Sequence, residues 1–165
     1  MKYSIVYNSK TGNTALLAEK LKAILPQEDN VYCGIPDKKA EETELIFVGF
    51  WTDKGSSDQA TSAFLKRLFN KKIFLFGTAG FGGNEAYFTQ ILSQVKDQLD
   101  RSNTVVGTYM CQGKMPLSVR KRYESMLAQD AEKMQRLIDN FDQARSHPND
   151  DDLTQLEQAV IEYTG

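Results

Sequence analysis

The stretch YSIVYNSKTGNTALLAEKL, residues 3–21, decides the fold of this chain. Residues 2–8 form a short apolar run rich in β-branched and aromatic side chains, which predicts a buried strand. Residues 13–25 then place leucine and isoleucine at helical spacing, and Pro26 follows them. Only a small polar loop separates the two runs. The sequence therefore predicts a strand, a tight loop and a helix in direct succession.

The same succession recurs along the rest of the chain. Four further short apolar runs predict strands: residues 30–33, 44–50, 72–76 and 104–110. Apolar residues at helical spacing predict helices over residues 60–69, 85–99 and, without a break, 117–141. Strands that alternate with helices are typical of a parallel sheet, and continuously apolar strands indicate helices on both faces. We therefore expect an α/β fold with a doubly wound five-stranded parallel sheet.

A change in composition marks the C-terminal part of the chain. The segment SHPNDDD, residues 146–152, is polar and contains a proline. We expect one domain over residues 1–145 and a C-terminal extension over residues 146–165. Leu153, Leu156, Val160 and Ile161 have the spacing of an apolar stripe, so the extension is a candidate for a short helix.

The overall charge and the cysteines exclude several classes of function. The formal net charge is −2, so no strong field attracts nucleic acid or an anionic membrane. Cys33 and Cys111 are far apart in sequence and match no metal motif, which favours buried or idle thiols in a reducing compartment. No apolar run approaches the ~20 residues that span a bilayer, and residues 1–21 do not resemble a signal peptide. We expect a cytoplasmic protein.

The polar loop between the first strand and the first helix is rich in hydrogen-bond donors. It consists of Ser9, Lys10, Thr11, Gly12, Asn13 and Thr14. In a doubly wound sheet this loop lies where ligands bind, and it opens a helix whose first N–H groups and dipole favour an anion. The loop matches neither GxxxxGK[ST] nor GxGxxG, and its hydroxyls suit a terminal phosphate monoester. The alternative is a helix start that serine or threonine simply caps.

The motif SKTGNT, residues 9–14, resembles the phosphate loop [ST]-x-T-G-x-T of the flavodoxin-like family. The resemblance covers about residues 1–141 and is closest to the short-chain, FMN-binding type. It implies the strand order 2-1-3-4-5, with FMN at the carboxyl ends of the strands, as known for flavodoxin itself. Two further loops would then hold the isoalloxazine ring.

The first ring-binding loop implied by the resemblance follows the strand at residues 44–50. It contains Trp51, Thr52, Asp53, Lys54 and Gly55. The large flat indole of Trp51 is suited to stack on a flavin, and the alternative is an indole buried in the core. Family members place a glycine directly after the stacking residue, where a peptide flip bonds flavin N5. Thr52 stands there in this chain, which puts that flip in doubt.

The second ring-binding loop follows the strand at residues 72–76 and is rich in glycine. It contains Thr78, Ala79, Gly80, Phe81, Gly82 and Gly83. Main-chain groups of the first three would bond the pyrimidine edge of the flavin. Phe81 would cover the second face of the ring, or alternatively plug the top of the sheet.

A fourth polar segment, residues 111–116, follows the last strand. Gln112 or Lys114 would reach the flavin or a partner, and the alternative is a solvated turn. His147 is the lone histidine, lies in the polar extension and is not expected to act as a general base. The sequence contains no recognisable metal cluster or Ser/His/Asp set.

The resemblance implies noncovalent FMN and electron transfer between a reductase and a partner enzyme, for example one that acts on tetrapyrroles. Two alternatives remain open. One is an FMN-dependent oxidoreductase, such as a quinone reductase or a protoporphyrinogen-oxidase-like enzyme, and the other is a scaffold that has lost its flavin and acts as a binding module. The phosphate-loop reading predicts that Thr11→Ala and Thr14→Ala each weaken FMN binding by about 1–2 kcal/mol. The redox partners and the oligomeric state are not specified by the sequence.

Overall fold

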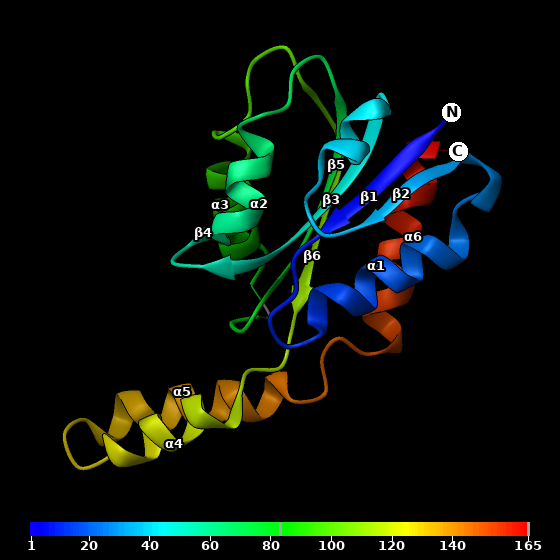
Figure 1. The fold of residues 1–165 in the computed structure, drawn as a ribbon. Helices are drawn as coiled ribbons and strands as arrows, with labels where there is room; N and C mark the ends of the chain where they lie inside the picture. The colour runs from blue at the N-terminus through cyan, green and yellow to red at the C-terminus, as the bar shows by residue number, and fades with distance from the viewer. Residues whose placement is uncertain (83, 165) are drawn as a thin grey trace.

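Five parallel strands form the central sheet in the order β2-β1-β3-β5-β6 (Figure 1). The structure is a computed structural model that describes residues 1–82 and 84–164. The strands are β1 (Tyr3–Tyr7), β2 (Asn30–Gly34), β3 (Leu45–Asp53), β5 (Lys72–Ala79) and β6 (Thr104–Gln112). A short strand, β4 (Ser56–Ser57), pairs antiparallel with the end of β3. The predicted doubly wound sheet and its strand order are confirmed.

Helices cover both faces of this sheet. On one face lie α1 (Asn13–Ile24) and α6 (Asp150–Thr164), and on the other lie α2 (Gln59–Leu65) and α3 (Glu85–Lys96). Two 3₁₀ turns, Gln27–Asp29 and Lys38–Glu42, flank β2. The arrangement explains why the strands are apolar throughout, since alternate side chains enter two separate cores.

The pairing of β3 with β5 is fixed by two phenylalanine–glycine pairs. Gly49 lies opposite Phe76, and Phe50 lies opposite Gly77. A Cβ atom on Gly77 would lie 2.3 Å from Phe50 Cζ, and one on Gly49 would lie 2.3 Å from Phe76 Cε2. Each ring therefore occupies the space that the opposite glycine leaves free, one ring in each core.

Three strands extend further than the sequence predicts. β3 continues through Asp53, β5 through Ala79 and β6 through Gln112, so residues expected in loops are strand ends. The cause is pairing with neighbouring strands, one distant in sequence and one close. Trp51 pairs with Thr78, and the end of β3 pairs with β4. Lys54 and Gly55, both with positive φ (51° and 81°), form the two-residue turn between β3 and β4.

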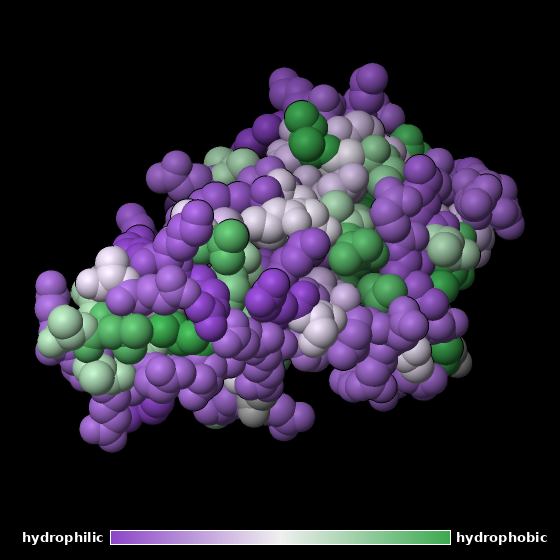
Figure 2. Space-filling model, turned by 90° about the horizontal axis from the view of Figure 1, so that it is seen from below, coloured by the Kyte–Doolittle hydropathy of each residue, from purple (hydrophilic) through white to green (hydrophobic). Residues whose placement is uncertain are grey.

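The predicted single helix over residues 117–141 is wrong. The structure has two helices there, α4 (Leu117–Ser125) and α5 (Ala131–Ala144), which form a hairpin that projects from the carboxyl end of the sheet (Figure 1). Asp130 starts the second helix, since its Oδ1 accepts a hydrogen bond from Lys133 N at 3.1 Å. Viewed from below, Figure 2 shows an apolar stripe along this hairpin, framed by hydrophilic side chains.

The segment after residue 146 folds back from the hairpin onto the sheet as α6. Its Leu156 and Val160 are buried in the same core as α1. The Tyr109 hydroxyl donates to the Asp152 carbonyl at 2.6 Å and ties α6 to β6. None of the helices formed by the described residues has both the length and the hydropathy needed to cross a bilayer.

Candidate functional site

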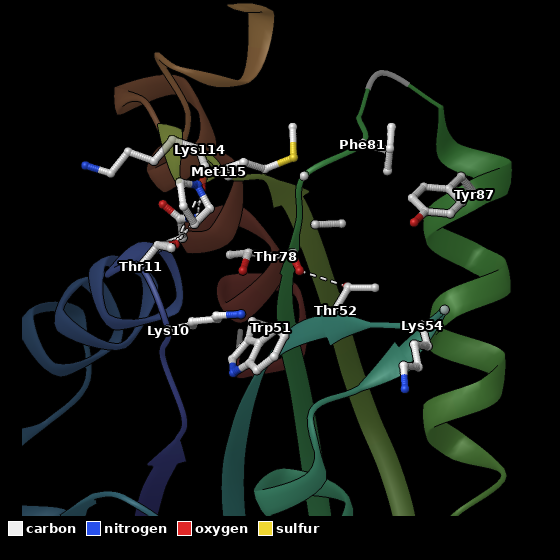
Figure 3. A pocket seen from close by; sticks show the side chains of 16 residues that line it. Lys10, Thr11, Trp51, Thr52, Lys54, Thr78, Phe81, Tyr87, Lys114 and Met115 are labelled. Atoms are coloured by element: carbon white, nitrogen blue, oxygen red, sulfur yellow. Dashed lines mark hydrogen bonds between the residues drawn. The ribbon is translucent and has the colours of Figure 1, made fainter. Parts of the chain in front are cut away.

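A cleft of about 330 Å³ opens at the carboxyl ends of the strands. It lies beside the point where chain order reverses between β1 and β3, which is where doubly wound sheets bind ligands. Eleven of the residues predicted from sequence line it together: Lys10, Thr11, Asn13, Trp51, Thr52, Lys54, Gly55, Thr78, Ala79, Gly80 and Phe81 (Figure 3).

The remaining predicted residues lie outside the lining of the cleft or outside the described residues. Ser9, Gly12, Thr14, Asp53 and Gly82 do not line the cleft. Gly83 lies outside the described residues. Sequence reasoning missed four lining residues: Tyr87, Gly113, Met115 and Pro116. The polar segment after β6 was the one signal that pointed to the last three.

The first loop combines a capped helix start with free main-chain donors. Gly12 has φ 88°, and Ser9 Oγ accepts hydrogen bonds from the N–H groups of Gly12 and Ala15 at 3.1 and 3.3 Å. Among residues 1–82 and 84–164, no hydrogen bond satisfies the N–H of Asn13 or Thr14, the first two residues of α1. The N-terminus of α1 therefore keeps donors and a dipole that suit an anion.

Thr14 faces the interior of the protein. Its side chain is fully buried, and its hydroxyl donates to the Phe50 carbonyl at 3.1 Å and lies 3.1 Å from Thr78 Oγ1. The hydroxyl therefore links the start of α1 to β3 and β5. Thr11, by contrast, lines the cleft.

Asn13 ties the first loop to the segment after β6. Its Nδ2 donates to the Lys114 carbonyl at 2.8 Å and to Thr11 Oγ1 at 2.9 Å. Its Oδ1 is buried and has no partner among the described residues. A Cβ atom on Gly113 would lie 2.5 Å from Asn13 Nδ2, so only glycine permits this close approach.

Trp51 lies at the centre of the cleft wall (Figure 3). Asp58, which is almost fully buried, accepts a hydrogen bond from the Trp51 N–H at 3.2 Å and holds this part of β3. The Lys10 ammonium lies 5.1 Å from the centre of the indole ring, within range of a cation–π interaction. The Thr52 hydroxyl donates to the Thr78 carbonyl at 2.8 Å. The indole is half-buried and lines the cleft.

The opposite wall is aromatic and is held from behind by two amides. Phe81 meets Tyr87 edge to face, with 6.4 Å between ring centres. The Gly80 carbonyl accepts from Gln112 Nε2 at 3.0 Å and from Asn140 Nδ2 at 3.1 Å. Gln112 therefore does not reach the cleft but joins its wall to α5, whereas Lys114 lines the cleft as the sequence suggested.

The charged side chains that line the cleft are all basic. Three lysines line the cleft, and none of the lining residues within the described chain is a carboxylate or a histidine. The remaining titratable group is the Tyr87 hydroxyl, and burial raises its pKa. The site can bind an anion and an aromatic ring, but it offers little for acid–base catalysis near neutral pH.

The fold and the cleft at the carboxyl ends of its strands place the chain in the doubly wound α/β class. The chain belongs to the flavodoxin domain family, whose model matches residues 4–161. It is 35% identical to the flavodoxin-like domain-containing protein BilS of Clostridium symbiosum, over 98% of this chain and 95% of that protein. It is 30% identical to BilS of Clostridioides difficile, over 93% and 90% of the two chains.

Solved structures confirm the fold. Flavodoxin 2 from Bacillus cereus superposes with a TM-score of 0.63 at 16% identity, over 99% of this chain and 98% of that one. A flavoprotein from Lactobacillus acidophilus, solved in complex with FMN, superposes with a TM-score of 0.52 at 17% identity, over 67% of this chain and 93% of that one.

Proposed function

We propose that this chain binds FMN in the cleft and transfers electrons between a reductase and a partner enzyme. The observation that supports this most is the combination of free amides at the start of α1 with the half-buried indole of Trp51 on one cleft. The amides and Thr11 would hold the phosphate, and Trp51 with Phe81 would contact the ring. FMN, when bound, supplies the electron-transfer chemistry, while the protein supplies binding, orientation and electrostatics.

The cofactor assignment has a second source of support. The neighbour from Lactobacillus acidophilus is a complex with FMN, and the family model is a flavodoxin domain. The residues present here fit that group. The loop of residues 9–14 offers main-chain donors for a phosphate, and Trp51 and Phe81 offer aromatic side chains for the ring.

A carrier is favoured over a stand-alone oxidoreductase by the lining of the cleft. Enzymes that reduce small substrates commonly place a proton donor beside the reacting atoms. The described lining contains no carboxylate or histidine, and burial raises the pKa of Tyr87. The oxidoreductase reading predicts rapid quinone reduction without a partner protein.

Titration of the purified protein with FMN under anaerobic conditions tests the proposal. We expect quenching of FMN fluorescence, a perturbed flavin spectrum and stepwise reduction by dithionite. Trp51→Ala should alter the quenching and the spectrum, and Trp51→Phe should retain most of both because it keeps an aromatic face. A colourless protein whose addition leaves FMN fluorescence unchanged would show that the chain has no flavin site. Fast turnover of quinones by the reduced protein alone would favour the oxidoreductase.

A further inference from the structure

The charge around the cleft is opposite in sign to the charge of the whole chain. The formal net charge is −2, yet Lys10, Lys54 and Lys114 all line the cleft and no described carboxylate does. All three lysines are exposed, and none forms an ion pair with a described residue. Like charges gathered at a cleft reinforce one another, because low-dielectric walls focus their field.

Two of these lysines are fixed through their backbones while their side chains remain free. Lys114 donates its N–H to the His147 carbonyl at 2.9 Å, and its own carbonyl accepts from Asn13 at 2.8 Å. Lys54 has φ 51° at the tip of the β3–β4 turn, a conformation that asparagine or glycine adopts more easily.

The positive charge continues onto α4. Pro116 lines the cleft and directly precedes this helix. Lys121 and Arg122 follow within about 10 Å along the helix axis, at about 1.5 Å per residue. Both are exposed and without an ion pair among the described residues, whereas Arg120 is bound by Asp142 and Glu124. This spacing is comparable to the Debye length at physiological salt, so these charges act with those of the cleft.

Apolar side chains accompany these charges. Phe81 lines the cleft and is 40% exposed, and Leu117, directly after Pro116, is 57% exposed. Apolar contacts set among polar and charged ones are typical of protein–protein interfaces.

We propose that this rim, formed by Lys10, Lys54, Lys114, Lys121 and Arg122, is a cationic docking surface for an acidic face of the redox partner protein. The inference rests on the proposed electron-carrier function and adds the chemistry of the partner. Complementary charge at the rim would raise the rate of encounter and orient the partner's redox centre toward the cleft. The net charge of the chain, −2, would by itself predict a preference for a basic partner.

Stopped-flow reduction of two haem proteins tests this surface. The reduced FMN-bound protein is mixed with an acidic cytochrome b5 or with a basic cytochrome c, at ionic strengths from about 20 mM to about 500 mM, a range over which the Debye length falls several-fold. We expect the rate constant for the acidic cytochrome to fall as salt is added. The double variant Lys54→Gln/Lys114→Gln should lower that constant about tenfold at low salt, the smaller end of known steering effects.

The matched control removes the same charge elsewhere. Lys66→Gln/Arg101→Gln removes two exposed cations near the amino ends of β5 and β6, where Asn103 Nδ2 donates to the Leu68 carbonyl at 2.8 Å. This control should leave the rate constant within about twofold, because the removed charges lie away from the edge of the sheet where the cleft opens.

Three outcomes would overturn the docking surface. One is a rate constant for the acidic cytochrome that rises with salt while that for cytochrome c falls. Another is an equal effect of the two double variants. The third is a loss of FMN affinity in Lys54→Gln/Lys114→Gln with unchanged cytochrome rates, which would assign the lysines to the cofactor. A flavin spectrum in the starting protein keeps each of these distinct from failure of the proposed function, in which no flavin binds.

Discussion

Removing the hydroxyl of Thr14 should affect folding rather than cofactor binding. The variant Thr14→Val keeps the shape of the side chain and removes only the hydroxyl. In the native protein that hydroxyl is buried, donates to the Phe50 carbonyl at 3.1 Å and lies 3.1 Å from Thr78 Oγ1. Thr11 provides the comparison, because its side chain lines the cleft.

The expected size follows from the contacts that are lost. Removing one partner from a buried hydrogen bond costs about 1–3 kcal/mol of unfolding free energy. With an m-value of about 1–3 kcal/mol/M, the urea midpoint should fall by roughly 1 M. The FMN dissociation constant should change by less than about threefold, equivalent to about 0.6 kcal/mol. Thr11→Ala should weaken FMN binding by about 1–2 kcal/mol and lower the midpoint less than Thr14→Val does, because its hydroxyl bonds Asn13 and Lys114 at the open cleft and not in the interior.

Urea denaturation of the apoprotein and fluorescence titration with FMN measure the two quantities separately. Thr14→Ser is the control, because it keeps the hydroxyl and should retain most of the stability. If Thr14→Val weakened FMN tenfold and left the midpoint in place, the hydroxyl would point to the phosphate and the interior placement would be refuted.

Two further predictions concern the core and the alkaline pH dependence of stability. Gly77→Ala should lower the unfolding free energy by about 1–3 kcal/mol in urea denaturation, because its Cβ would lie 2.3 Å from Phe50 Cζ. Adding Phe50→Leu should recover part of the loss, and an unchanged midpoint in Gly77→Ala would contradict the packing. Burial raises the pKa of the Cys111 thiol and of the Tyr109 hydroxyl, so the folded protein retains both protons after the unfolded chain has released them. Stability should therefore be constant below about pH 8.5 and fall above it, by up to about 1.4 kcal/mol per pH unit for each group. Urea midpoints from neutral pH upward would show this, and Cys111→Ala should reduce the earlier part of the fall, since burial also raises the pKa of the Cys33 thiol; identical profiles for both proteins would exclude Cys111 as a contributor.

Local patterns predicted the elements of this fold well, and their ends poorly. The apolar run at residues 44–50 identified β3, but Trp51 and Thr52 also belong to it because they pair with β5 and β4. The partner of Trp51, Thr78, is distant in sequence, so the point where β3 ends is not set by the local sequence alone. The helix over residues 117–141 was split for a related reason. The apolar residues of this segment fitted one long helix, but Tyr123, Met134 and Ile138 become buried only when α4 and α5 fold against each other.

Sequence by itself determined the class of the fold and the position of the cleft, because periodicity and the loop SKTGNT are local and the carboxyl ends of parallel strands meet at one edge. Only the tertiary structure decided what each side chain does there. It directs Thr14 inward and leaves Thr11 on the cleft, and it brings Lys114 to within a hydrogen bond of Asn13 across about a hundred residues of chain. It also gathers lysines from three separate segments around one opening. Such proximity depends on how strands pair and helices pack, and no pattern of neighbouring residues encodes it.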